Sequence, residues 1–379
     1  MTAHNLVVSF VTRPDRGGEG GVGWSFLVGA AQRASQSADR LSAIIDSRDA
    51  ADVARHLSML GLDQSVEVHA VPLPRHIAQR FKDRRSRSAY MAWLPGAHHL
   101  ASVLSSRHSF TNAHQVTFAT ATLPPAIPRR TAPHRVWGPV GVPVSSRHAG
   151  ARKALGAQLA RGLARRNVRS FTKVIALNDH SQRMISGWGT GEVELEPNVV
   201  CEPVASERPR EDDLLVTSGL LITRKRPWLA IGIMTDPRLR DYRLKIIGDG
   251  PLASDLQRLA EDLGVARRVT FTGSLPREEA VQALASARCL VHPSSREGSP
   301  WVVGEAAACG VPAVVFANSG AEATVRLSAN GGQIVAEDAD HSGALASGVI
   351  SALAQPSPLP SHRWSAQRIP KLLSDWWVE

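Results

Sequence analysis

The chain has 379 residues, enough for two or three domains of ordinary size. Hydrophobic residues make up 43% and charged residues 21%, a balance that fits a globular protein with full cores and excludes a disordered or membrane-embedded chain. The formal net charge of +10 favours anionic partners, whether nucleotides, nucleic acid or acidic lipid surfaces.

Cysteine usage and the apolar segments indicate the compartment. The three cysteines, Cys201, Cys289 and Cys309, have no paired spacing and no metal-ligand pattern, which predicts free thiols in a reducing environment. The apolar run Leu6–Val11 lacks the basic flank and cleavage site of a signal peptide, and no apolar stretch is long enough to span a bilayer. We therefore expect a cytoplasmic protein, at most peripheral at the inner face of the membrane.

Short apolar runs alternate with amphipathic helical runs along the first half of the chain, which predicts a parallel sheet covered by helices. The expected strands are Leu6–Val11, Leu41–Ile45, Val66–Val71, Val116–Ala119, Val136–Gly138 and Val174–Leu177. The expected helices are one from Trp24, after a glycine-rich loop, and those at Asp49–Leu60 and Ala149–Arg166.

The second half repeats this alternation more clearly. The expected strands are Leu214–Ser218, Tyr242–Ile247, Val269–Thr272, Cys289–His292, Pro312–Ala317 and Gln333–Ala336. The expected helices are Pro227–Met234, Leu252–Leu263, Pro276–Ala287, Trp301–Cys309 and Ser342–Leu353. Six strands with intervening helices predict one complete domain of the nucleotide-binding type.

Two interruptions of this pattern set the expected domain boundaries. Polar residues and Pro197 break the strand pattern at Glu196–Asn198, which divides residues 1–196 from residues 197–360. The proline-rich stretch Gln355–Pro360 then separates a last helix, Ser365–Trp377, so that residues 361–379 form a short third segment.

The segment Glu297–Glu305 combines the features of a binding site. Glu297 lies in a loop after a strand, and Glu305 lies on the helix that follows. Gly298 allows a ligand to approach the backbone, and the start of the helix offers free N–H groups and partial positive charge. A diphosphate fits there, and the two carboxylates can accept hydrogen bonds from sugar hydroxyls. The same pattern also fits an ordinary strand–turn–helix corner with two surface glutamates.

Together with the segments around it, this block resembles the retaining glycosyltransferases of family 4 (glycosyl transferases group 1). The other matching segments of the second half are Gly219–Lys225, Gly248–Pro251, Phe271–Gly273, Pro293-Ser294, Ala306 and Gly310–Pro312. The resemblance implies an α/β chain of the GT-B fold, with two Rossmann-like, doubly wound domains facing each other across a cleft. Residues 1–196 would bind the acceptor, residues 197–360 the nucleotide sugar, and the helix of residues 361–379 would pack back on the N-terminal domain.

The resemblance also implies roles for residues of the second half. The first glutamate of the pair binds the transferred sugar in that family and the second binds the ribose, so these roles fall to Glu297 and Glu305. Lys225 occupies the place of the lysine that grips the diphosphate, where it acts as a catalytic cation. The remaining residues expected at the donor are Gly298, Ser299, Gly248 and Asp249.

One position departs from the family's pattern. An arginine usually follows the glycine of the first loop of the C-terminal domain, and here the residue is Leu220. Arg224 and Arg226 are the candidates to supply the missing cation, and we assign Arg224 to the donor site.

The first half resembles the family through shorter segments. Gly17–Trp24 is similar to its glycine-rich loop, which assigns Gly20 and Gly21 to nucleotide-sugar binding. Trp137–Gly141 and Asn178–Ser181 are similar to two further segments. His114 matches a histidine of one branch of the family and is a candidate catalytic residue near the sugar. A lone histidine in a chain is more often a structural residue with its hydrogen bonds satisfied.

The resemblance implies transfer with retention of anomeric configuration, in which the leaving diphosphate takes the acceptor proton and no protein base is needed. The expected partners are a nucleotide-diphosphate sugar and an acceptor that is a sugar, a lipid-linked sugar or a small molecule. We expect no cofactor and no metal. The pair Asp338 and Asp340 is predicted to cap the next helix, and His98 and His99 lack helical ligand spacing.

An NAD(P)-dependent oxidoreductase is one alternative. Gly18, Gly20 and Gly23 have the spacing of a dinucleotide fingerprint, and Asp46 ends the second expected strand. However, Thr12–Arg16 separates the glycines from the first strand, and this alternative leaves the Glu297–Glu305 segment unexplained.

A basic protein that binds a membrane surface is a second alternative. Leu155, Leu159 and Leu163 share one face of the expected helix 151–166. The basic residues around them are Arg152, Lys153, Arg161, Arg165 and Arg166, and a second basic cluster is Arg80–Arg85. These residues fit either contact with an anionic membrane or an ordinary helix docked on its sheet. No zinc-finger spacing or RNA-stacking motif accompanies the charge, so we expect no nucleic acid partner.

Overall fold

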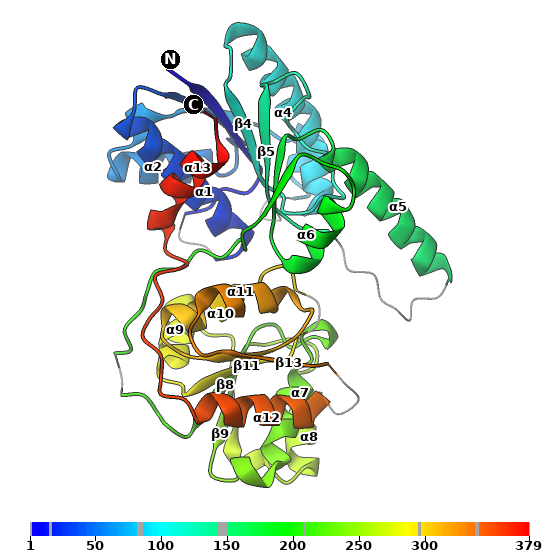
Figure 1. The fold of residues 1–379 in the computed structure, drawn as a ribbon, viewed down its shortest axis with the longest axis vertical. Helices are drawn as coiled ribbons and strands as arrows, with labels where there is room; N and C mark the ends of the chain where they lie inside the picture. Colours follow the sequence, from blue (N-terminus) through cyan, green and yellow to red (C-terminus); the bar gives the residue numbers. More distant parts are fainter. Residues whose placement is uncertain are drawn as a thin grey trace. The chain divides into compact units, whose positions relative to one another are not determined.

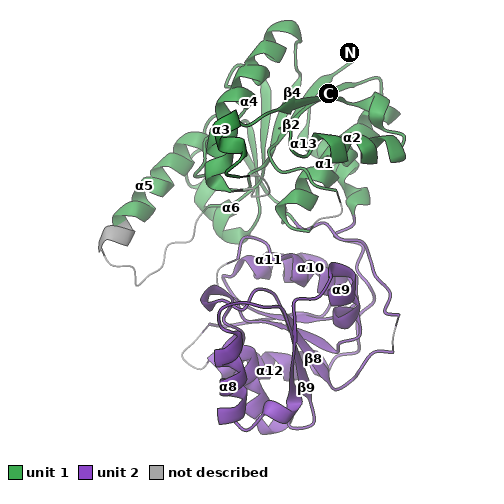
Figure 2. Ribbon diagram, turned by 180° about the vertical axis from the view of Figure 1, so that it is seen from behind, with its two compact units in different colours: residues 1–198, 366–379 green, residues 199–365 purple. Residues whose placement is uncertain are grey.

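The computed structural model describes residues 2–14, 17–81, 86–142, 151–207, 209–294, 297–337 and 341–378 (Figure 1). The chain divides into two units, residues 1–198 with 366–379 and residues 199–365 (Figure 2). Each unit contains one parallel sheet with its own buried core.

The first unit contains a seven-stranded sheet in the order β3-β2-β1-β4-β5-β6-β7. Its strands are β1 His4–Ser9, β2 Arg40–Asp46, β3 Glu67–Val71, β4 Asn112–Thr117, β5 His134–Val140, β6 Lys173–Ala176 and β7 Glu192–Leu195. Its helices are α1 Glu19–Gln36, α2 Ala50–Met59, α3 Arg75–Ala78, α4 Arg87–Arg107, α5 Ala151–Val168, α6 Asp179–Ser186 and α13 Ile369–Trp376. The central strands are buried along their length, because helices cover both faces of a parallel sheet.

The second unit contains a six-stranded sheet in the order β10-β9-β8-β11-β12-β13. Its strands are β8 Leu214–Ser218, β9 Arg243–Ile247, β10 Val269–Gly273, β11 Cys289–His292, β12 Ala313–Phe316 and β13 Gln333–Val335. Its helices are α7 Pro227–Gly232, α8 Ala253–Asp262, α9 Arg277–Ala285, α10 Trp301–Ala308, α11 Gly320–Ser328 and α12 His341–Leu353. The α/β fold predicted from the alternation of apolar runs is confirmed in both units.

Both sheets reverse their strand order at one place. The reversal lies between β1 and β4 in the first unit and between β8 and β11 in the second. In open parallel sheets, ligands bind in the crevice outside the carboxyl ends of the strands at such a reversal. The topology therefore points to one candidate binding site in each unit.

The glycine-rich segment differs from its prediction. It is not a loop before a helix at Trp24, because α1 already begins at Glu19 and includes Gly20, Gly21 and Gly23 in its first turns. A Cβ atom on Gly23 would lie 1.9 Å from the carbonyl oxygen of Val11. The glycines thus allow the helix to start directly against the chain that leaves β1.

Several other boundaries differ, and some elements escaped prediction. β1 begins and ends two residues before the predicted strand, and β4 begins at Asn112 instead of Val116. The elements that the sequence pattern did not predict are α3, α4, α6, α11 and β7.

The end of the chain belongs to the first unit. Residues 366–379 group with residues 1–198, and α13 packs on α1, where a Cβ atom on Gly29 would lie 2.6 Å from Ile369. The buried Trp376 stacks on Phe26, and its Nε1 donates to Glu194 Oε1 at 2.8 Å. Arg368 pairs with the buried carboxylate of Glu196 at 3.0 Å.

Gly248 provides a test of how closely the second unit is packed. It follows β9 with a φ of 135°, and an added Cβ would lie 2.0 Å from the carbonyl oxygen of Gly219. We expect Gly248→Ala to lower the free energy of unfolding by about 3 kcal/mol, because backbone must move to admit the methyl group. Urea denaturation followed by circular dichroism measures this loss.

The matched control is Gly264→Ala in the same unit. Gly264 also has a positive φ of 69°, but no atom lies within 4 Å of its added Cβ. We expect it to lose only about 1 kcal/mol from backbone strain. Equal losses in the two variants would contradict the close backbone approach at Gly248.

Candidate functional site

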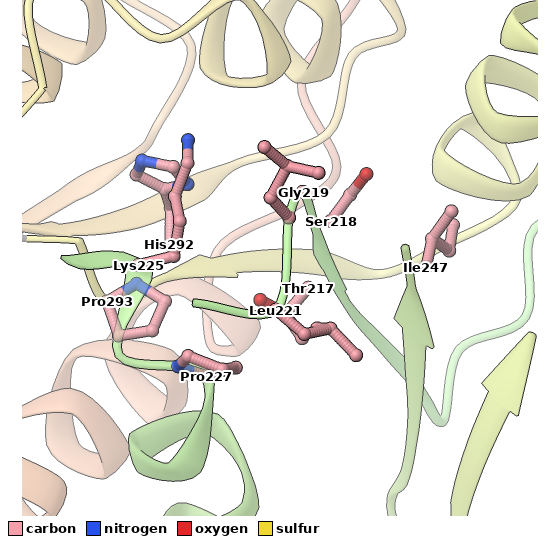
Figure 3. A pocket seen from close by; sticks show the side chains of 10 residues that line it. Thr217, Ser218, Gly219, Leu221, Lys225, Pro227, Ile247, His292 and Pro293 are labelled. Atoms are coloured by element: carbon pink, nitrogen blue, oxygen red, sulfur yellow. The ribbon is translucent and has the colours of Figure 1, made fainter. Parts of the chain in front are cut away.

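A pocket of the second unit lies at the reversal between β8 and β11 (Figure 3). The residues that line it are Thr217, Ser218, Gly219, Leu220, Leu221, Lys225, Pro227, Ile247, His292 and Pro293. They come from the carboxyl ends of β8, β9 and β11 and from the chain that leads into α7. The pocket is thus the ligand site that the topology of this sheet predicts.

The loop after β8 is held by backbone hydrogen bonds to the end of β9. Gly219 N donates to the Ile247 carbonyl, and Leu221 N donates to the Asp249 carbonyl, both at 2.9 Å. A short 3-10 turn, Thr223–Lys225, follows and ends at Arg226, which has a left-handed φ of 53°. This path places the Lys225 side chain along the pocket, beside His292 (Figure 3).

Two cations meet one carboxylate beside this pocket. Glu297 Oε1 lies 2.7 Å from Lys225 Nζ and 2.8 Å from an Arg224 guanidinium nitrogen, and it also accepts from Ser294 Oγ at 2.8 Å. Burial alone would raise the pKa of Glu297, but the adjacent charges of Lys225 and Arg224 outweigh it and hold that pKa below its usual range. The cluster therefore combines an ionised carboxylate with two positive charges.

Arg224, and not Arg226, is the arginine near Lys225 and Glu297. The Arg226 guanidinium pairs with Glu337 at 2.5 Å and lies over the Phe316 ring. Leu220, at the position where the resemblance leads one to expect an arginine, lines the pocket with an exposed side chain. The arginine of this cluster thus lies four residues further along the chain than Leu220.

His292 is a pocket residue that sequence reasoning missed. It ends β11 and is only 2% exposed, and its Nε2 has no hydrogen-bond partner among the residues that the structure describes. Burial, and then the charge of Lys225, lower the pKa of His292 to about 3, so the ring is neutral. A polar residue at the end of an apolar strand, directly before Pro293, was the signal in the sequence.

Glu305 lies in a separate pair. Its carboxylate on α10 receives a hydrogen bond from Arg277 at 2.6 Å, and the Arg277 guanidinium lies over the Trp301 ring. Burial raises the pKa of Glu305 despite this partner. The structure therefore brings Glu297, Lys225 and Arg224 together but does not include Glu305 among the residues that line the pocket.

The remaining residues predicted at the donor site are Gly298, Ser299, Gly248 and Asp249. The backbone of Gly298 lies against the start of α11. A Cβ atom on Gly320, the first residue of α11, would lie 2.0 Å from the Glu297 carbonyl oxygen and 2.3 Å from that of Gly298. Ser299 Oγ is buried without a hydrogen-bond partner within the described ranges. Gly248 and the exposed Asp249 support the loop after β8 and do not line the pocket.

His114 does not lie at a binding surface, and its predicted catalytic position is wrong. The ring is fully buried on β4, where Nε2 donates to the Gly138 carbonyl at 2.8 Å. The rings of Phe26, Trp376 and Trp377 pack around it. Burial lowers the pKa of His114 to about 4, so it is a neutral core residue that no substrate reaches.

The reversal in the first unit contains a carboxylate that sequence reasoning also missed. Glu19 begins α1, and its Oε1 accepts from Ala119 N, just after β4, at 2.5 Å. Burial raises the pKa of Glu19 to about 7, against smaller opposing effects of the hydrogen bond from Ala119 N and of the Arg87 charge. Gly20 and Gly21 are buried in the turn that follows, with their backbone inside α1.

Some residues on which the dinucleotide, metal and membrane alternatives rest have partners within the protein, and others lie outside the described residues. Asp46, the candidate ribose acid of a dinucleotide site, is buried and bonded to Arg48. The described residues contain no group of three or more histidine, cysteine or acidic side chains that could hold a metal ion. Outside the described residues lie Asp338, Asp340, Lys82–Arg85 and the side chains of Arg152 and Lys153.

Comparison with known proteins connects the second unit with a family. Residues 202–368 match the family Glycosyl transferases group 1. The GDP-mannose-dependent alpha-(1-6)-phosphatidylinositol monomannoside mannosyltransferase of Mycolicibacterium smegmatis is 35% identical over 170 residues, which cover 41% of this chain and 44% of that protein. The D-inositol 3-phosphate glycosyltransferase of Thermomonospora curvata is 32% identical over 149 residues, 36% of this chain and 35% of that one. The chain spans less than half the length of these curated relatives.

Solved structures extend the likeness in fold to nearly the whole chain. The sucrose-phosphate synthase of Thermosynechococcus elongatus aligns over 98% of this chain and 94% of its own, with a TM-score of 0.60 and 15% sequence identity. Together with the two Rossmann-like sheets, this likeness identifies the fold as GT-B.

Glu19 gives the first unit a testable pH dependence. Because its folded pKa of about 7 lies above the unfolded value of 4.5, the native state loses stability as the pH rises from about 4.5 to 7. Glu19→Gln keeps an oxygen for the Ala119 N–H without this loss. We expect the variant to gain about 3 kcal/mol over the wild type by pH 8, and nothing at pH 4.

Thermal unfolding at a series of pH values measures the difference. Asp63→Asn, which removes an exposed carboxylate of the same unit, is the control and should follow the wild type at every pH. A Glu19→Gln difference that does not change between pH 4 and 8 would contradict a raised pKa.

Proposed function

We propose that the chain is a retaining glycosyltransferase, which transfers a sugar from a nucleotide-diphosphate donor to a hydroxyl of its acceptor. The observation that carries this proposal is that Lys225 and Arg224 both pair with Glu297 beside the pocket at the reversal between β8 and β11. Two cations suit a diphosphate, and a carboxylate suits the hydroxyls of the attached sugar. The family match over residues 202–368 supports the same activity.

Donor binding would redistribute the contacts of Glu297. A single carboxylate oxygen of Glu297 forms ion pairs with Lys225 and Arg224 and accepts a hydrogen bond from Ser294 Oγ. A diphosphate offers the two cations more negative charge, so they would bind its oxygens and release part of Glu297 to accept from a sugar hydroxyl. The neutral His292 ring beside Lys225 would donate a further hydrogen bond to a phosphate oxygen.

The proposed reaction breaks the bond between the anomeric carbon and the diphosphate oxygen and forms a bond from that carbon to the acceptor oxygen on the same face. The acceptor proton goes to the departing phosphate oxygen, so no protein base takes part. Lys225 and Arg224 stabilise the charge that grows on the diphosphate as its bond to the sugar breaks.

The relatives suggest which compounds to test first. One is named as GDP-mannose-dependent and acts on a phosphatidylinositol mannoside, and another is named for D-inositol 3-phosphate. We propose GDP-mannose as the first donor to test, and a polyol or sugar acceptor, free or lipid-linked, that carries a phosphate. Uridine and adenosine diphosphate sugars are the comparison set.

Variants of the two cations test the donor site. We expect Lys225→Ala and Arg224→Ala each to weaken binding of the matching nucleoside diphosphate about 30-fold, the loss of a charged hydrogen bond. Isothermal titration with GDP, UDP and ADP measures it. Arg226→Ala is the matched control, because this neighbour in the same turn pairs with Glu337, and its affinity should stay within about twofold of wild type. Wild-type affinity in both test variants would overturn the assignment.

Measurements of sugar transfer test both the role of Glu297 and the expected independence from metal. We expect Glu297→Gln to lower transfer about 100-fold while nucleoside diphosphate binding persists, since the ionised carboxylate serves the sugar. Transfer by the wild type should be undiminished in excess chelator, because Lys225 and Arg224 neutralise the leaving group. Loss of activity in chelator that magnesium restores would refute the metal-independent mechanism.

A further inference from the structure

Helix α5 presents three leucines to solvent. Leu155, Leu159 and Leu163, which we call the leucine stripe, are 59%, 63% and 52% exposed. They are four residues apart and therefore share one face of the helix. Ala164 and Val168, toward the end of the same helix, are fully buried in the core of the first unit. The helix is thus anchored through the opposite face, and the alternative that these leucines dock on the sheet is wrong.

Figures 1 and 2 show from both sides that most of α5 extends beyond the sheet of its own unit. The anchoring residues Ala164 and Val168 lie in the last turns of α5, shortly before Phe171 and β6, whereas Leu155 and Leu159 lie in the turns that precede Ala164. A row of half-exposed leucines is costly in water unless a partner covers it, because each side chain loses burial that stabilises it.

Basic residues accompany the leucine stripe along α5. Arg165, Arg166 and Arg169 are exposed along the same helix and its end, and Arg161 is partly exposed. Between Asp83 and Asp179 the sequence contains fifteen lysines and arginines and not one aspartate or glutamate. Any partner of the stripe therefore meets positive charge without compensating carboxylates from this part of the chain.

The excess charge of the protein also belongs to this unit. Residues 1–198 with 366–379 contain twenty-seven lysines and arginines against fifteen acidic residues, a formal charge of +12. Residues 199–365 contain seventeen against nineteen, a formal charge of −2. The positive field is thus a property of the unit that presents the leucine stripe.

We propose that α5 binds the surface of an anionic lipid bilayer, with the leucine stripe inserted among the acyl chains and the arginines on lipid phosphates. A helix that binds at a membrane interface needs both apolar side chains and flanking arginines. Apolar insertion alone, or attraction to anionic lipid alone, does not hold a protein firmly at a membrane. Arg166, which lies beside the stripe, can keep its charge at the phosphate level through its long side chain. A second copy of the helix fits less well, because its arginines would face those of the first.

Vesicle sedimentation tests this surface with the full-length protein. We expect binding to phosphatidylcholine vesicles that contain about one third phosphatidylglycerol, weaker binding at high salt, and little binding to phosphatidylcholine alone. Absence of binding to the anionic vesicles at low salt would overturn the proposal.

Two variants separate the apolar and the charged contribution. The triple variant Leu155→Gln, Leu159→Gln, Leu163→Gln should reduce the partition coefficient at least about 10-fold, and Arg165→Glu with Arg166→Glu should do the same. The matched controls are Met59→Gln with Leu60→Gln, an exposed apolar pair of the same unit, and Arg240→Glu with Arg267→Glu, an exposed basic pair of the other unit. Circular dichroism verifies that each variant is folded.

Two outcomes would contradict the role of the stripe even if the protein binds vesicles. One is a leucine variant that binds as its control does, which would leave only a diffuse charge effect. The other is a leucine variant whose main change is loss of self-association in sedimentation velocity, which would identify a second copy as the occupant. Nucleoside diphosphate binding is measured in parallel and should be unchanged, so failure here is distinct from failure of the donor site.

Discussion

The close approach of three strand ends in the second unit is the constraint on which the candidate site depends. Gly248 allows the loop after β9 to approach the Gly219 carbonyl, in the loop after β8, to a distance that no side chain would permit. The chain can then turn through Thr223–Lys225 and present a lysine to the loop after β11, where Glu297 lies. Gly320 allows a second close backbone approach, because α11 begins directly against the carbonyl groups of Glu297 and Gly298. Backbone packing, and not the ion pair itself, sets the position of the charges.

The electrostatics of this cluster suit an anion that comes and goes. Among the described side chains of the cluster, Glu297 supplies one negative charge against the two positive charges of Lys225 and Arg224. His292 adds none, because burial and Lys225 keep its ring neutral. A fully balanced cluster would bind a diphosphate weakly, whereas two bare cations in a partly buried site would destabilise the fold. A cluster in which two cations share one carboxylate is intermediate between these two cases. The cations could exchange the Glu297 carboxylate for a diphosphate when it binds.

The sequence predicted the repeated strand–helix pattern, since buried parallel strands appear as short apolar runs. It also singled out Glu297, Lys225 and Arg224, which the structure brings together. It missed α4, because Pro95 and Gly96 inside that helix are typical of a turn. It misplaced His114 and overlooked His292 for the same physical reason. Both histidines lie on buried strands, and only tertiary packing decides that one is sealed under tryptophan rings and the other borders a pocket.

Helix α5 is a second case in which the sequence pattern does not decide whether a face is buried or exposed. A leucine every fourth residue is compatible with a face packed on a sheet and with a face turned to a membrane, and composition cannot separate them. What separates them is the neighbouring face: Ala164 and Val168 already occupy the contact with the core, so the leucines have no place left inside. Small residues suffice to anchor the helix at its end, which frees the larger apolar surface for a partner. The excess positive charge is concentrated in the same unit, whereas the unit that contains Lys225 and Arg224 has a formal charge of −2. The proposed attraction to an anionic surface and the proposed recognition of a diphosphate therefore depend on different parts of the chain.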